Sequence, residues 1–198
     1  MKIRLLEERD IKRVIEIYSY YIENTTITFE YTVPSYDEFK KRFLNIQKQY
    51  PFIVYEENEK IYGYAYASTH HERAAYSWNC EFSIYIDKDF RGKGIGAILY
   101  KALEDIVREQ GYYTAYALIT VPNDRSFAFH KKQGFEIEGI NKNTGFKFEK
   151  WLDVATLSKP LREYTKPSKF PLSINNIDSE KTNNILKKYS DNKKTDLF

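Results

Sequence analysis

The stretch Asp87–Leu99 reads DKDFRGKGIGAIL and carries glycines at alternate positions, Gly92, Gly94 and Gly96. An apolar run precedes it and apolar residues at helical spacing follow it, which predicts a turn from a strand into a helix. The whole chain has only 8 glycines in 198 residues, so this concentration needs a reason. Glycine permits left-handed backbone and lets main-chain N–H groups approach a ligand closely. The glycines therefore predict a ligand-binding turn.

The expected ligand of this turn is a phosphate group. Free N–H groups at a helix start, with the helix dipole behind them, bind anions, and Arg91 and Lys93 add positive charge. A P-loop requires Ser or Thr after its Gly-Lys, where this chain has Gly94, and the dinucleotide fingerprint reads G-x-G-x-x-G rather than G-x-G-x-G. Both fit poorly. A pyrophosphate cradle is the functional interpretation, and a glycine-softened turn is the structural alternative.

Composition narrows the class of protein. The 198 residues suffice for one well-buried domain, and 31 Lys+Arg against 28 Asp+Glu give a net charge of +3, too mild to imply a nucleic-acid partner. No apolar run approaches the roughly 20 residues of a membrane span, and the N-terminal residues lack the apolar core of a secretory signal. The single cysteine fits a reducing compartment, and with three histidines it leaves little for a metal cage. We predict a cytoplasmic protein without metal, nucleic acid or membrane as partner.

Strand and helix patterns alternate on both sides of the turn. Strands are expected at 2–6, 52–56, 61–69, 78–86, 113–120, 135–141 and 146–157. Helices are expected after a cap at Asp10, after the capping box at Ser35, from Ile95 to Gly111, and from Pro122 to Gly134. Because strands and helices alternate over 78–135, at least part of the sheet should be parallel.

Several motifs follow one another in a fixed order. They are R-x-x-G-x-G at 91–96, YSWNCEFSIYI at 76–86, PNDRS at 122–126, His130 followed by Gly134-Phe135, GFK at 145–147 and WLD at 151–153. Together they resemble the GNAT N-acetyltransferase superfamily, and within it the phosphinothricin acetyltransferase branch, over residues 2–162. The resemblance implies an α/β protein with the GNAT fold: a mixed, largely antiparallel twisted sheet of six to seven strands with about four helices, and splayed central strands that hold acetyl-CoA. It also implies an acetyl-CoA-dependent N-acetyltransferase and a homodimer.

The resemblance assigns cofactor contacts to three segments. The main chain of Ile84, Tyr85 and Ile86 would contact the pantetheine arm. The turn would hold the pyrophosphate through Arg91, Gly92, Lys93, Gly94, Ile95 and Gly96. Asn123 would hydrogen-bond the arm, with Ser126 as a weaker companion. An asparagine at a helix start can instead serve only as an N-cap.

Two residues are candidates for proton transfer. Glu81 lies in an otherwise apolar and aromatic strand, where desolvation raises a carboxyl pKa towards working pH, and the family's catalytic glutamate falls here. The alternative is a strand-edge glutamate facing water. His130 lies where many superfamily members carry a tyrosine that protonates the leaving thiolate. The alternative is a histidine whose ring nitrogens are hydrogen-bonded within the fold and whose role is structural. Cys80 neighbours Glu81, but successive strand residues face opposite sides, so we expect buried packing.

The acceptor side is assigned by analogy. Phe29 and Tyr31 would line one wall of the amine pocket. Arg73 would grip an acidic group, since guanidinium matches a carboxylate or phosphinate bidentately; a solvated loop arginine is the alternative. Phosphinothricin, methionine sulfone and methionine sulfoximine are the acceptors that the resemblance suggests, with a detoxifying or resistance role. His71 departs from a lysine found in some relatives, which leaves the exact acceptor open.

Two other functions remain open. One is an acetyltransferase for an aminoglycoside, a polyamine or a protein N-terminus, although a cationic acceptor needs acidic walls and Arg73 argues for an anionic one. The other is a CoA-binding module without turnover. Variation at Glu81 separates enzyme from module, because a glutamine there should leave binding intact and abolish most transfer.

The C-terminal segment differs in composition. Residues 166–198 contain no glycine, seven lysines and five asparagines, with a weak helical pattern at 177–189. We therefore divide the chain into a domain at 1–162 and an appendage at 163–198, weakly helical or extended. Apolar residues in the appendage predict that it docks, on a partner subunit or over the acceptor pocket.

Overall fold

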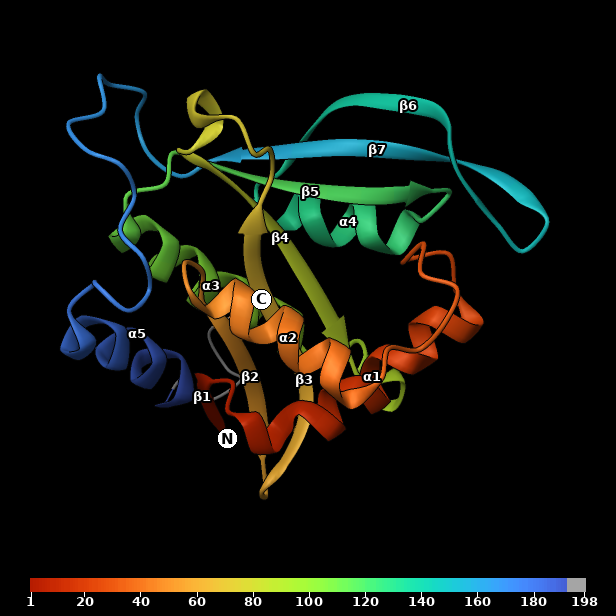
Figure 1. The fold of residues 1–198 in the computed structure, drawn as a ribbon, viewed down its shortest axis with the longest axis horizontal. Coiled ribbons are helices and arrows are strands. Elements are labelled where there is room, and N and C mark those ends of the chain that lie inside the picture. The colour runs from red at the N-terminus through yellow and green to blue at the C-terminus, as the bar shows by residue number, and fades with distance from the viewer. Residues whose placement is uncertain (192–198) are drawn as a thin grey trace.

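The sheet runs in the order β1-β2-β3-β4-β5-β7-β6 in the computed structural model, which describes residues 1–191. Helices α1 and α2 cover one face, and α3 and α4 the other (Figure 1). The strands are β1 (Lys2–Leu5), β2 (Phe52–Glu57), β3 (Lys60–Thr69), β4 (Asn79–Ile86), β5 (Thr114–Val121), β6 (Glu136–Lys147) and β7 (Lys150–Pro160). The helices of the described part are α1 (Ile11–Asn24), α2 (Tyr36–Gln47), α3 (Ile95–Gln110), α4 (Asp124–Lys132) and α5 (Ser179–Asp191).

The central strands β4 and β5 form the parallel pair of an otherwise antiparallel sheet. They are in register only over Asn79–Glu81 and Thr114–Tyr116, although β4 continues to Ile86 and β5 to Val121. Beyond the paired residues the strands diverge, as Figure 1 shows. This confirms the mixed, largely antiparallel sheet with splayed central strands. The fifth helix comes from the C-terminal segment.

Two apolar clusters hold the layers together. One lies under α3, where Leu99, Leu103 and Ile106 are fully buried against Cys80 and Ala115. The other lies under α1 and α2. Burying one such aliphatic side chain contributes about 1.5–3 kcal/mol. The apolar residues of α3 recur every three or four positions, so the same pattern that predicts the helix also fixes its buried face.

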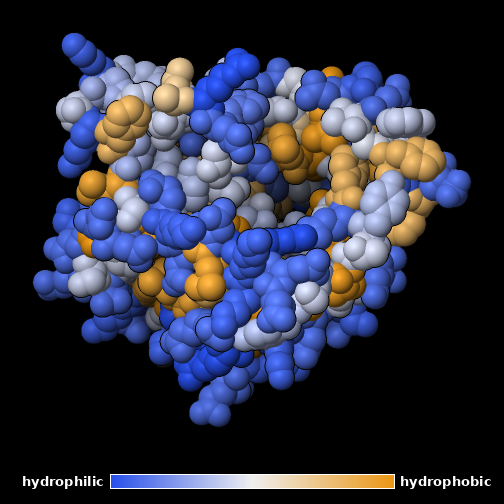
Figure 2. Space-filling model, viewed as in Figure 1, coloured by the Kyte–Doolittle hydropathy of each residue, from blue (hydrophilic) through white to orange (hydrophobic). Residues whose placement is uncertain are grey.

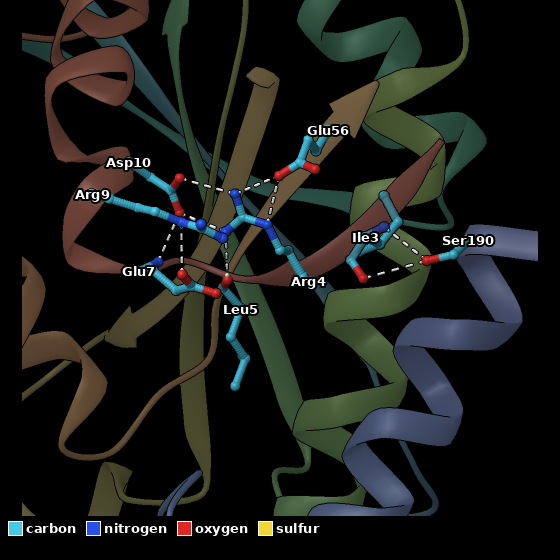
Figure 3. A network of polar contacts seen from close by, with 8 residues as sticks. All are labelled: Ile3, Arg4, Leu5, Glu7, Arg9, Asp10, Glu56 and Ser190. Atoms are coloured by element: carbon cyan, nitrogen blue, oxygen red, sulfur yellow. Dashed lines mark hydrogen bonds and ion pairs between the residues drawn. The ribbon is translucent and has the colours of Figure 1, made fainter. Parts of the chain in front are cut away.

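The N-terminal strand is fastened by an ion-pair network (Figure 3). The Arg4 guanidinium donates to both carboxylate oxygens of Asp10, at 2.6 and 2.9 Å, and its Nε donates to Glu56 at 2.7 Å. Helix α1 begins directly after Asp10, as predicted, but the Asp10 side chain does not cap it. Its oxygens are taken by Arg4 and by the Glu7 N–H, and it makes no cap bond to α1.

The last hairpin also differs from expectation. A break was expected after residue 141, but β6 continues to Lys147, with a register shift between Asn141 and Gly145, and turns at Phe148–Glu149. Both turn residues have positive φ, 50° and 57°, without being glycine. Gly145 is needed for packing instead, since a Cβ there would overlap the ring of Phe29.

The C-terminal segment docks on its own chain, beside α3 and β1 (Figure 1). Its extended part bonds through the N–H of Leu172 to Gln110 O and of Ile174 to Gln49 O, at 2.8 and 3.0 Å. Ser190 Oγ in α5 accepts the N–H of Ile3 on the edge strand β1, at 2.8 Å. None of the helices within residues 1–191 has the length and apolar content required to cross a bilayer.

Candidate active site

The glycine turn adopts the backbone that its sequence predicts. Gly92 and Gly94 have φ of 81° and 82°, and Gly94 is the left-handed N-cap of α3. A side chain in that conformation costs roughly 1–2 kcal/mol. A Cβ on Gly92 would meet only the Arg125 guanidinium, at 3.8 Å, so the concave side is open. The first N–H groups of a helix have no intrahelical acceptor, which leaves those of Ile95 and Gly96 without a helical partner at this turn.

Cationic side chains surround the turn. The Arg91 guanidinium lies over the Tyr20 ring, 5.1 Å from its centroid, and donates to Tyr20 Oη at 3.3 Å. The exposed Lys93 ammonium lies 3.8 Å from the centroid of Phe90. Arg125, from the PNDRS motif, is a third cation that sequence reasoning did not single out. Positive charge beside exposed N–H groups is the arrangement that typically binds anions in proteins.

The splayed end of β4 presents unpaired main chain. The N–H of Asp87 donates to Tyr62 O of β3, at 2.8 Å. Backbone groups of successive strand residues point to alternate sides, so those of Tyr85 also face β3, whereas those of Ile84 and Ile86 point towards the gap beside β5. Tyr21 of α1 hydrogen-bonds both backbone groups of Ile86, because its hydroxyl donates to Ile86 O and accepts from Ile86 N. Among the three expected contacts, Ile84 is the one left facing the gap.

A cavity of about 510 Å³ opens on the α1/α2 side of the sheet. Figure 2 shows this face hollowed between the β5–β7–β6 strands and helices α1 and α2. The lining residues come from the β3–β4 connection and from four strands: His70, His71, Tyr76, Asn79, Glu81, Tyr116, Leu118, Glu138, Gly139, Asn141 and Thr156. Glu81 lies in the last paired position of β4, where the two central strands begin to separate. An acceptor in the cavity would thus lie beside the gap.

Glu81 has the environment of a base. Its side chain is 23 % exposed. Burial raises the pKa of this carboxyl, while the His70 imidazole, with Nδ1 at 3.3 Å from Oε2, acts in the opposite direction. A carboxylate with a raised pKa can take a proton from an ammonium group at neutral pH.

The family comparison accounts for this combination of a glycine turn, splayed strands and a half-buried carboxylate. The family described as "Acetyltransferase (GNAT) domain" matches residues 3–156. The chain belongs to the GNAT acetyltransferases. A phosphinothricin N-acetyltransferase of Streptomyces coelicolor is 31% identical over 78% of this chain and 92% of its own length. An L-methionine sulfoximine/L-methionine sulfone acetyltransferase of Pseudomonas aeruginosa is 31% identical over 73% of this chain and 86% of its own.

A solved structure agrees in fold. A phosphinothricin acetyltransferase from Sinorhizobium meliloti in complex with acetyl-CoA is 38% identical, covers 84% of this chain and 92% of its own, and superimposes with a TM-score of 0.81. The chain is an acetyl-CoA-dependent N-acetyltransferase, as the sequence predicts. The open side of Gly92 and the gap-facing groups of Ile84 fit a ligand with a diphosphate and an amide-bearing arm. Within residues 1–191 no group of three His, Cys, Asp or Glu side chains could hold a metal ion.

In this acetyltransferase, Asn123 and His130 lie on the opposite face from the cavity. Asn123 Oδ1 accepts the N–H of Ser126 at 3.2 Å and caps α4. His130 is 5% exposed. Its Nδ1 donates to Ser126 O at 2.8 Å, and its Nε2 lies 2.9 Å from the hydroxyl of Tyr100, which donates to it. Burial lowers the pKa of this imidazole. The geometry favours the structural alternative, and the general-acid role stays an untested prediction.

The His130 cluster does contact the glycine turn. The ring of Phe129 lies 5.1 Å from those of both Tyr100 and His130. A Cβ on Gly96 would lie 3.1 Å from Phe129 Cε2. The cluster therefore supports the first turn of α3 from behind, and Gly96 is small so that α4 can approach.

The expected acceptor residues lie outside the cavity lining. Phe29 packs on Gly145, and the Tyr31 hydroxyl donates to Phe146 O. The buried Lys147 ammonium donates to Thr28 O at 2.8 Å, so the loop after α1 is strapped to the β6–β7 hairpin. Arg73 is exposed, in the connection that carries His70 and Tyr76. Cys80 is fully buried on the α3 side, and burial raises the pKa of its thiol.

Proposed function

We propose that this acetyltransferase moves the acetyl group of acetyl-CoA to the primary amine of a small, amino-acid-like acceptor of the phosphinothricin, methionine sulfone or methionine sulfoximine type. A detoxifying or resistance role would follow. The observation that carries the proposal is Glu81, a half-buried carboxylate on a cavity wall at the point where the central strands separate. The names of the relatives support the acceptor class.

The proton balance of the reaction defines the role proposed for Glu81. The acceptor ammonium loses one proton to Glu81, directly or through a water, and its nitrogen attacks the thioester carbonyl carbon. A C–N bond forms and the C–S bond breaks. The nitrogen then gives up a second proton and the departing thiolate gains one, so one proton in total leaves to solvent. The N–H of Ile84, facing the gap, is the proposed donor to the developing oxyanion.

The cofactor contacts are proposed for the segments that the resemblance assigns. The turn at 91–96 holds the diphosphate, and the Ile84 carbonyl accepts from an amide of the cofactor arm. Asn123 and Ser126 serve α4 in the present arrangement, so their contribution to the arm would come from groups other than the Asn123 Oδ1. Arg125 joins Arg91 and Lys93 as a counter-charge to the diphosphate.

The acceptor's acidic group is proposed to meet Arg73 at the mouth of the cavity. Arg73 O accepts the N–H of Tyr76 at 2.9 Å, which links it to a lining residue. Phe29 and Tyr31 would form the outer wall through the loop that they anchor. A second candidate acceptor is a polyamine or another cationic amine, because the cavity wall holds two carboxylates, Glu81 and Glu138.

A homodimer is proposed from the surface of the β6–β7 hairpin. Trp151 and Ile137 are 65% and 57% exposed, and β6 is an edge strand. Exposed apolar residues on an unpaired edge are typical of an interface. Sedimentation equilibrium of the full chain should give twice the monomer mass, whereas a monomer at all concentrations would remove this part of the proposal.

An acceptor screen tests the function. Thiol release from acetyl-CoA would be followed with phosphinothricin, methionine sulfone, methionine sulfoximine, a polyamine, an aminoglycoside and a peptide with a free N-terminus. We expect kcat/KM for the first three to exceed that of the others at least about 100-fold, the difference that about 2.7 kcal/mol of transition-state binding gives. Preference for the polyamine would select the second candidate. Acetyl-CoA binding without transfer to any amine would leave a binding module.

A further inference from the structure

His70 lies beside Glu81 in an arrangement that no motif of the sequence indicates. It follows β3 directly, and its ring is stacked flat on Tyr116, with centroids 4.0 Å apart and planes inclined by 3°. Tyr116 is the residue of β5 that pairs with Glu81 of β4. The imidazole Nδ1 lies 3.3 Å from Glu81 Oε2. Three neighbouring strands thus bring one imidazole to the carboxylate that faces the cavity.

The ring of His70 is held in place from two sides. Tyr116 covers one face, and the ring of His71 lies 4.2 Å away, inclined by 48°. The His70 side chain is 11 % exposed. An imidazole fixed in this way directs Nδ1 at one carboxylate oxygen and leaves the other oxygen of Glu81 for the cavity. A carboxylate without such a partner would sample several orientations at the cost of catalytic geometry.

We infer that His70 is a positioning residue for Glu81: its Nδ1–H holds the carboxylate in the orientation in which it takes the proton of the acceptor amine. The inference rests on the proposed role of Glu81 as the base. It has an electrostatic consequence, because an N–H donated to a carboxylate stabilises the charged form. Burial raises the pKa of Glu81 and His70 opposes that rise, so His70 keeps the base ionised to lower pH.

Other titratable groups surround the pair and belong in any account of its pH dependence. On the cavity side they are Tyr66 of β3, His71 and Tyr76 of the β3–β4 connection, Tyr116 of β5 and Glu138 of β6. Cys80 and Tyr100 lie behind Glu81 on the α3 side. Glu72 lies in the same β3–β4 connection, is exposed and does not line the cavity, which makes Glu72→Gln the control.

Two substitutions separate hydrogen bonding from stacking. His70→Phe keeps an aromatic ring on Tyr116 and removes the N–H, whereas His70→Asn places an amide N–H near the position of Nδ1 without a ring. We expect His70→Phe to lower kcat about tenfold at pH 7 and to move the acidic limb of the kcat profile up by about one pH unit, with KM for acetyl-CoA unchanged. His70→Asn should recover most of kcat and the position of the limb. Glu72→Gln should change kcat less than about twofold.

The outcomes are separable from failure of the proposed function. A wild-type pH profile and kcat in His70→Phe would overturn the inference while leaving Glu81 as the base, provided that Glu81→Gln is inactive. An Asn variant as impaired as the Phe variant would also overturn it, since the N–H would not then be the cause. If Glu81→Gln keeps the wild-type rate, the base assignment itself fails and His70 has nothing to position. Melting temperatures of all variants identify any that fail to fold.

Discussion

The two faces of the sheet each carry a histidine among aromatic rings, and the two regions differ in how the imidazole is bonded. Behind the sheet, both nitrogens of His130 are engaged by Tyr100 and Ser126, and the ring is buried. In the cavity, His70 lies against the carboxylate of Glu81. A fully bonded, buried imidazole supports its surroundings, whereas one that faces an ionisable group in a cavity influences chemistry. The comparison predicts that changes in the cavity lower kcat and that changes behind it lower stability and cofactor affinity.

The largest effect is expected at Glu81. Glu81→Gln should lower kcat about 1,000-fold, within the range of general-base catalysis, with acetyl-CoA affinity preserved. Glu138→Gln is the matched control, because Glu138 lines the same cavity but is exposed on β6. Steady-state kinetics and calorimetric binding of acetyl-CoA measure both. Equal losses in the two variants would mean that cavity charge, rather than a base at Glu81, drives transfer.

The next effect concerns His130. His130→Ala removes the partner of the Tyr100 hydroxyl and leaves a cavity, which should cost about 2–4 kcal/mol of unfolding free energy. Since the cluster supports the turn through Phe129, KM for acetyl-CoA should rise about threefold with kcat nearly unchanged. Denaturant unfolding and kinetics check this. A kcat loss beyond about tenfold in a variant of normal stability would instead restore the general-acid role.

The two regions should respond oppositely to pH. Burial lowers the pKa of His130, so its contribution to stability is complete above the unfolded pKa of about 6.5 and declines as pH falls below it. Burial raises the pKa of Glu81, so the ionised carboxyl destabilises the native state as pH rises. His130→Gln should flatten the decline in melting temperature below pH 6.5, and Glu81→Gln should raise the melting temperature at pH 8 but not at pH 4. Parallel curves for wild type and both variants would contradict the comparison.

The smallest effect is expected where the C-terminal segment packs against the residue that precedes β4. Phe170 stacks on Trp78, with centroids 4.9 Å apart, and Trp78 directly precedes β4. Both rings are partly exposed, so Phe170→Ala should cost only about 1 kcal/mol. It should alter KM for the acceptor and leave KM for acetyl-CoA unchanged. A larger change in KM for acetyl-CoA than in KM for the acceptor would show that the segment acts on the face of the sheet that carries His130.

Much of the fold could be predicted from local pattern. The glycine spacing predicts the left-handed turn into α3, because only glycine adopts that backbone without strain. The capping box at Ser35 predicts the start of α2, where the Ser35 side chain accepts from Glu38 N. Both signals depend on residues a few positions apart, and such short-range chemistry is legible in a sequence.

The errors have the opposite origin. Asp10 is a good capping residue, but Arg4, brought alongside by β1, takes its oxygens. The expected gap between strands at 141 and 146 is also absent, and Gly145 within it is small because Phe29, from a distant loop, lies on it. No local motif indicates a role for His70, since its partners Glu81 and Tyr116 come from other strands. Each of these depends on contacts between segments far apart in the chain.

By itself the sequence determined the family, the left-handed glycine turn and the identity of the candidate base, because ordered motifs and the conformational freedom of glycine act locally. The tertiary structure alone decided which histidine faces the Glu81 carboxylate, which backbone groups open on the gap, and that the C-terminal segment covers the edge strand β1. The physical reason is that burial, charge pairing and strand divergence arise only when distant residues meet. The chemistry of a side chain depends on these long-range contacts as much as on its residue type.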